Sequence, residues 1–133
     1  METGNIETAV RDVLLAHPEV EVGLLFGSAA GHALKSFSDI DVAVGGAHRF
    51  SSGQKMALIG DLALAAGRPV DLVDLSAVSG LILRESLTTG VLLVNRDPDR
   101  YAGFILKMWY NQADMMPNYY TMLKAQAEEF ARG

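Results

Sequence analysis

The fold is decided by residues 24–44, which read LLFGSAAGHALKSFSDIDVAV. A short apolar run ends in Gly27-Ser28, ten residues follow, and Asp39-Ile40-Asp41 then opens a second apolar run. Both runs are short, rich in bulky aliphatic side chains and bounded by Gly or Ser, as buried β-strands are. The stretch therefore predicts two strands separated by a polar connection.

The second strand places two carboxylates on one side. Alternate side chains of a strand share a face, so Asp39 and Asp41 point the same way and Ile40 points into the core. Their Cα atoms are then roughly 7 Å apart, and the two charges repel unless a cation lies between them. A hard divalent metal ion, which prefers oxygen ligands, is the simplest such cation.

Gly27 and Ser28 end the first strand in a way that suits a phosphate group. Glycine lets the backbone approach a ligand closely, and free amide groups and a hydroxyl supply hydrogen-bond donors. Taken alone, a Gly-Ser pair is an ordinary turn and an Asp beside a strand is an ordinary cap. The joint spacing should occur by chance in roughly one chain of this length in several hundred. The sequence therefore predicts a nucleotide–Mg²⁺ site.

The pattern Gly-Ser, ten residues, Asp-x-Asp after a strand resembles the signature of the nucleotidyltransferase superfamily, which includes kanamycin nucleotidyltransferase and polymerase β. The short chain most resembles the minimal nucleotidyltransferases, the MNT or MntA-type antitoxins that pair with HEPN-domain toxins. The resemblance covers about residues 6–95. It departs in the connection, where many relatives carry Arg and Lys35 is the only fixed positive charge here.

The resemblance implies a Mg²⁺-dependent transfer of AMP from ATP to a tyrosine of a HEPN RNase toxin, which neutralises the toxin in a hetero-oligomer. It also implies a set of site residues. The catalytic and metal-binding residues would be Asp39, Asp41 and Asp71, and the nucleotide-binding residues would be Gly27, Ser28, Lys35 and Ser38.

The third carboxylate is expected on the strand that reads VDLVDL, residues 70–75. Alternation puts Asp71 and Asp74 on opposite faces, so both cannot join the acids of the preceding strand. In the family the third acid comes from this strand, and the matching position is Asp71. Asp74 stays open as the alternative, although its place at the strand end also suits a turn or a cap.

The remaining segments alternate helix and strand. Helices are expected over residues 5–16, 54–66 and 76–89, and a short strand over residues 91–94. In the second helix we expect an apolar stripe of Met56, Ile59, Leu62 and Ala63 to face the core. The fold class is α/β, a nucleotidyltransferase fold with a small mixed sheet and packed helices.

A long helical segment is expected after Asp97-Pro98, with Asp as the cap and Pro at the first helical position. Residues 1–97 would form the nucleotidyltransferase domain, and residues 98–133 a C-terminal helical segment of the same domain. This segment is rich in aromatic residues and Met, which are enriched at interface cores. We expect either packing on its own domain or contact with a partner protein through Tyr101, Ile105, Met108 and Trp109.

Composition narrows the function classes. The chain has 133 residues and no Cys, so disulfides are excluded. Its net charge of −5 argues against direct contact with nucleic acid. No apolar run is long enough to cross a membrane and the N-terminus is polar, so a cytoplasmic protein is expected. Two alternatives to the enzymatic antitoxin remain: a catalytically silent binding antitoxin, and a free-standing nucleotidyltransferase that acts on a small molecule.

Overall fold

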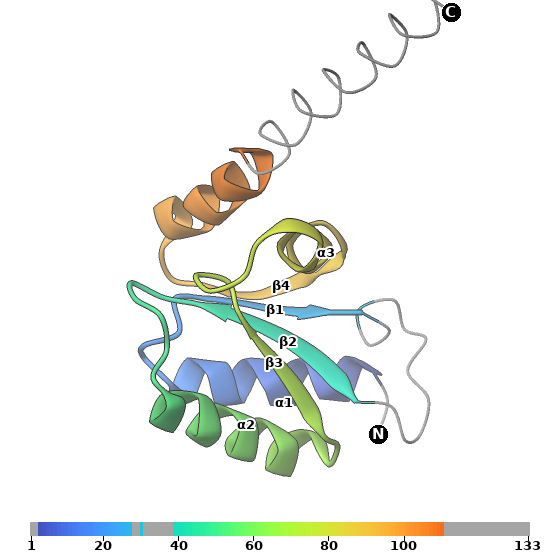
Figure 1. The fold of residues 1–133 in the computed structure, drawn as a ribbon. Helices are drawn as coiled ribbons and strands as arrows, with labels where there is room; N and C mark the ends of the chain where they lie inside the picture. The colour runs from blue at the N-terminus through green and yellow to red at the C-terminus, as the bar shows by residue number, and fades with distance from the viewer. Residues whose placement is uncertain (1–2, 28–29, 31–38, 111–133) are drawn as a thin grey trace, which may run out of the picture.

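The computed structural model describes residues 3–27, 30 and 39–110 (Figure 1). Four strands form one sheet in the order β3-β2-β1-β4. Strand β1 pairs antiparallel with β2 and β4, and β2 pairs parallel with β3, so the sheet is mixed as predicted. The strands are β1 (Val22–Phe26), β2 (Ile40–Gly45), β3 (Val70–Asp74) and β4 (Val91–Asn95).

Helices cover both faces of this sheet (Figure 1). On one face lie α1 (Thr3–Ala16) and α2 (Ser52–Ala66), and on the other α3 (Gly80–Thr89) and the C-terminal helix, described over residues 98–110. Each pair of helices has its own buried apolar cluster. The cluster under α1 and α2 includes Ile40, Val42 and Val44, whereas the cluster under α3 includes Leu24, Ala43 and Leu83.

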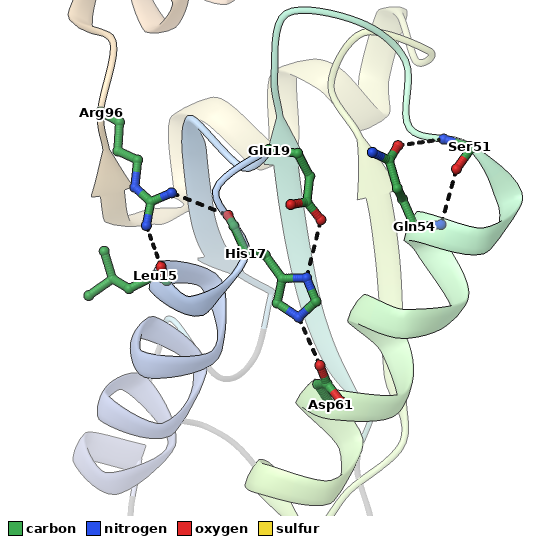
Figure 2. Close-up of polar contacts among 7 residues, drawn as sticks. All are labelled: Leu15, His17, Glu19, Ser51, Gln54, Asp61 and Arg96. Carbon is green, nitrogen blue, oxygen red and sulfur yellow. Dashed lines mark hydrogen bonds and ion pairs between the residues drawn. The ribbon is translucent and has the colours of Figure 1, made fainter.

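Polar contacts fix the ends of the helices on the first face (Figure 2). Ser51 caps α2: its Oγ accepts from the Gln54 amide at 3.1 Å, and Gln54 Oε1 accepts from the Ser51 amide at 2.9 Å. Arg96, just after β4, donates to the carbonyl oxygens of Leu15 and His17 at the end of α1. Because helix-terminal carbonyls have no partner within the helix, the guanidinium completes their hydrogen bonding.

The prediction of which side of α2 faces the core is wrong. The buried residues are Leu58, Leu62 and Ala66, whereas Met56 is 74% exposed and Ile59 is 37% exposed. The helix carries apolar residues on all sides, so its sequence period alone does not single out one face. Packing against α1 and β3 makes the choice.

The C-terminal helix begins as predicted. Asp97 Oδ1 accepts from the Arg100 amide at 3.1 Å, and Pro98 occupies the first helical position. Within the described residues no helix is long and apolar enough to cross a membrane.

Candidate active site

Asp41 and Asp71 lie side by side on the parallel strands β2 and β3, where they are partners in the register. Their strand neighbours Ile40 and Val42 belong to the cluster under α1 and α2, and Leu72 packs against it. Because side chains alternate between faces, both carboxylates point to the other face, which α3 covers. Asp39 immediately precedes β2 and is exposed.

Gly27 brings the end of β1 against the Asp41 carboxylate. Phe26 is the register partner of Asp41, and Gly27 follows with a φ of +70°. A Cβ atom added at Gly27 would lie 2.4 Å from Asp41 Oδ2. Glycine is therefore required here twice, for its left-handed backbone and for the space that the carboxylate occupies.

The site concentrates negative charge. Burial raises the pKa of Asp41 above its ordinary value, and the charges of Asp71, Glu85 and Asp39 raise it further, in that order. Repulsion of this kind is relieved by protonation or by a bound cation.

Glu85 is the one acidic neighbour that sequence reasoning missed. It lies on α3 at an exposed position and acts on Asp41 through its charge. The sequence places it only on the wet side of a helix that is distant along the chain. Only the packing of α3 over the carboxylate face of the sheet brings its charge near Asp41.

Asp74 has a different environment. It is only 5% exposed, and its two carboxylate oxygens accept from the amides of Phe50 and Ser76, each at 2.9 Å. Phe50 belongs to the cluster under α1 and α2, the side away from Asp41. The structure therefore places Asp74 at the end of β3, on the face away from Asp41, and Asp71 beside Asp41.

The remaining residues expected to bind the nucleotide, Ser28, Lys35 and Ser38, lie outside the described residues. Among the residues that are described, no three His, Asp or Glu side chains are grouped closely enough to hold a metal ion by themselves. Protein-bound Mg²⁺ usually takes only one or two carboxylates and completes its shell with substrate phosphates and water. The paired acids Asp41 and Asp71 fit that ligand set.

The four residues expected at a partner interface differ in their exposure to solvent. Met108 is 7% exposed and belongs to the cluster under α3, against which Tyr101 and Ile105 pack while partly buried. Trp109 is 60% exposed. Its exposed neighbours on the same helix are Leu106 (56%) and Tyr110 (67%), which the sequence had not singled out.

A family model described as "Polymerase beta, Nucleotidyltransferase" matches residues 9–99. The chain therefore belongs to this nucleotidyltransferase family, which confirms the expected fold. A comparison with curated proteins finds no match.

Solved structures similar to the chain are MntA or MNT antitoxins of HEPN–MNT complexes, as the resemblance predicted. A toxin–antitoxin structure with AMP-PNP shares 26% identity over 88% of this chain and 98% of that chain, with a TM-score of 0.69. The structure of the tri-AMPylated HEPN toxin of Shewanella oneidensis in complex with MNT antitoxin also shares 26% identity. It covers 91% of this chain and 98% of that chain, with a TM-score of 0.65. The MntA–HepT toxin–antitoxin structure, at 24% identity, covers 92% of this chain and 97% of that chain with a TM-score of 0.68 and supports the fold alone.

Proposed function

We propose that this chain is an antitoxin that transfers AMP from ATP to a tyrosine hydroxyl of a HEPN toxin. The observation that carries the proposal is the pairing of Asp41 with Asp71 in register, with the Gly27 backbone against the Asp41 carboxylate. In the reaction the tyrosine oxygen bonds to the α-phosphorus of ATP and the bond to the departing pyrophosphate breaks.

The donor set suits Mg²⁺. Asp39, Asp41 and Asp71 would hold it, because carboxylate oxygens are its preferred protein ligands. When bound, the ion would offset the charge of the triphosphate and of the leaving pyrophosphate. The raised pKa of Asp41, caused by burial and then by the charges of Asp71, Glu85 and Asp39, supports a cation site here.

The chain's own residues would bind and orient the reactants. Gly27 has no side chain, so its backbone can approach a phosphate, and Ser28, Ser38 and Lys35 would supply a hydroxyl or a positive charge there. Asp71 is exposed on the same face as Asp41. It is therefore the carboxylate that can accept the proton of an incoming hydroxyl.

The acceptor would be delivered by the partner protein. Leu106, Trp109 and Tyr110 expose a large apolar area on the C-terminal helix. Trp and Tyr are the residue types that dominate binding energy at interfaces. We propose that these exposed residues, with Trp109 at their centre, contact the toxin, and that Tyr101, Ile105 and Met108 support the helix from below.

The test is incubation of the chain with labelled ATP, Mg²⁺ and a HEPN toxin, followed by mass analysis of the toxin. We expect an increase by one or more AMP units on a tyrosine, and none with the variant in which Asp39 and Asp41 are both Ala. A variant that still neutralises the toxin without labelling it would establish a binding-only antitoxin. Label on a small molecule in place of the toxin would establish a free-standing transferase.

A further inference from the structure

We propose that Lys107 is a positioning residue for AMP transfer, because it fixes the C-terminal helix on the turn between β3 and α3. This proposal rests on the proposed function, which assigns the toxin contact to Trp109, two residues further along the same helix. The turn, residues 75–79, joins the strand that carries Asp71 to the helix that carries Glu85. Lys107 therefore connects the segment that would hold the toxin to the elements that border the carboxylates.

The Lys107 ammonium group is shared by three carbonyl oxygens of the turn. Its Nζ atom lies 2.9 Å from the carbonyl oxygen of Val78 and 3.3 Å from those of Leu75 and Ser76. An ammonium group has three N–H donors and no acceptor, so three converging carbonyl oxygens use all of them. Hydrogen bonds from a charged donor are stronger than those between neutral groups, and the Lys107 side chain is partly buried.

The amide groups of the same turn are held by Asp74. Its backbone oxygen accepts from the amides of Ala77 and Val78 at 3.0 and 3.2 Å, and its Oδ1 accepts from the amide of Ser76 at 2.9 Å. The turn thus donates to Asp74 and accepts from Lys107. Loss of the ammonium group would remove one half of this hydrogen bonding and leave the other half in place.

The start of α3 depends on contacts from outside the turn. Ser79 precedes the helix in an extended conformation, and within the described chain its side chain makes no capping hydrogen bond. Gly80 follows with a φ of +63°, and glycine restricts the backbone least of all residues. The bond from Lys107 to the Val78 carbonyl lies two residues before this start. It therefore helps to set the direction in which α3 leaves the turn.

Two other contacts hold the C-terminal helix, and neither fixes its orientation as Lys107 does. Phe104 packs on the end of β2, where a Cβ atom added at Gly45 would overlap its ring. Apolar packing of this kind is not directional. Arg100 Nε lies 3.3 Å from Glu21 Oε2, in a pair that is partly exposed and therefore weak. Lys107 is the directional contact nearest the exposed end of the described helix.

Orientation matters because the incoming oxygen must lie in line with the phosphorus–oxygen bond that breaks. A misplacement of about 1 Å can cost on the order of 10²-fold in rate. A toxin bound through Trp109 takes its position from the C-terminal helix. Without the Lys107 ammonium group the toxin should still bind, but its hydroxyl should be poorly placed. The rate constant kcat should fall while the affinities for ATP and toxin stay near those of the wild type.

Steady-state kinetics of Lys107→Met test this expectation. Methionine keeps an unbranched apolar side chain and removes the ammonium group. We expect kcat for labelling of a HEPN toxin to fall about tenfold or more, with both dissociation constants, measured by calorimetry, near the wild-type values. Lys55→Met is the matched control, because Lys55 is also partly buried and lies on α2, on the other face of the sheet (Figure 1). It should label the toxin as the wild type does.

A chemical rescue separates the ammonium group from the rest of the side chain. The chain has no Cys, so Lys107→Cys introduces its only thiol. When this variant is treated with bromoethylamine before toxin is added, the thiolate sulfur displaces bromide and the product carries an ammonium group at the length of lysine. Most of kcat should return. Alkylation with iodoacetamide adds a neutral group of similar size and should not restore it.

Trp109 reports on the helix independently of AMP transfer, because it is the only Trp of the chain. Time-resolved fluorescence anisotropy without toxin should show more local motion of Trp109 in Lys107→Met than in the wild type or in Lys55→Met. If the wild type does not label a HEPN toxin, the proposed function is refuted. The anisotropy would still show whether Lys107 holds the helix, so the two failures are distinguishable.

An unchanged kcat in Lys107→Met would overturn the proposal, as would unchanged motion of Trp109. A loss of ATP binding as large as the loss of labelling would also overturn it, because it would indicate a general loss of folding. The same holds if iodoacetamide restores Lys107→Cys as well as bromoethylamine does, because the ammonium group would then not be the part that matters.

Discussion

Asp41 and Asp71 stand directly opposite each other in the parallel register of β2 and β3, with the Gly27 backbone against the first of them. A carboxylate pair of this kind costs folding free energy when no cation is present. The cost is visible in the pKa of Asp41, which burial and the charges of Asp71, Glu85 and Asp39 raise above its ordinary value. This cost is what we expect of the ligand site that we propose at these two carboxylates.

Replacing Asp39 and Asp41 together by Ala should abolish AMP transfer without unfolding the chain. A carboxyl group with a raised folded-state pKa favours folding below its unfolded pKa and loses that contribution as pH rises through the folded value. Near neutral pH without metal, the double variant should therefore melt at an unchanged or higher temperature. Labelled AMP incorporation and thermal melting are measured in parallel, with exposed Asp12→Ala on α1 as the control. Undiminished incorporation would remove these residues from the site.

Asp71→Asn and Asp74→Asn should fail in different ways. Loss of a carboxylate that positions metal or takes a proton should reduce transfer on the order of 10²-fold or more, with the melting temperature retained. Asp74→Asn should keep transfer but lose about 1–3 kcal/mol of stability, because Asn has one acceptor oxygen and leaves the amide of Phe50 or of Ser76 without an acceptor. Kinetics and urea unfolding of both variants decide the assignment. A reversed order of activities would move the third acid to Asp74.

Gly27→Ala should damage the site through geometry alone. The added Cβ would lie 2.4 Å from Asp41 Oδ2, and the φ of +70° disfavours any side chain by about 1–2 kcal/mol. We expect strongly reduced nucleotide binding and AMP transfer, measured by titration calorimetry and labelling. Gly53→Ala is the matched control, since its Cβ would meet only Ser51 Oγ at 3.9 Å. Normal nucleotide binding by Gly27→Ala would show that this backbone does not border the ligand.

Trp109→Ala should weaken toxin binding by about 2 kcal/mol, roughly thirtyfold in the dissociation constant, because an exposed Trp is a typical hot spot. Its melting temperature and ATP binding should remain near those of the wild type. The adjacent Met108→Ala is the contrast: Met108 is 7% exposed, so the variant should lose about 2–5 kcal/mol of folding stability. Unchanged affinity for the toxin in Trp109→Ala would place the partner elsewhere.

His17 should make the stability of the chain depend on pH. Partial burial lowers the pKa of His17, but its hydrogen bonds to Asp61 and Glu19 and their charges raise it above 6.5 overall (Figure 2). The charged imidazole therefore stabilises the fold below pH 6.5, and this contribution is lost as pH rises through the raised folded-state pKa. Urea unfolding midpoints at several pH values should show this loss in the wild type. Asp61→Asn should flatten it, and Asp12→Asn should not.

The sequence by itself determined the class of protein and the order of the elements. The spacing of Gly27 and Asp39-x-Asp41 between two apolar runs predicted the class of protein, because a phosphate-binding turn and a carboxylate pair need fixed positions along adjacent strands. The alternation of side chains along a strand placed Asp71 and Asp74 on opposite faces of the sheet, because residues three apart in a strand always point to opposite sides. Local caps such as Ser51 and Asp97 were equally readable, because their partners lie within three residues.

Only the tertiary structure decided which side of each helix is buried and which residues that are distant in the sequence lie close together. α2 carries apolar residues on more than one side, so packing alone selected Leu58 as core and left Met56 and Leu64 exposed. The same holds for the C-terminal helix, where Met108 is buried and Trp109 is not. The charge of Glu85 acts on Asp41 only because α3 packs across the sheet. Electrostatic interactions depend on distance in space, and the distance between these two residues cannot be read from their positions in the sequence.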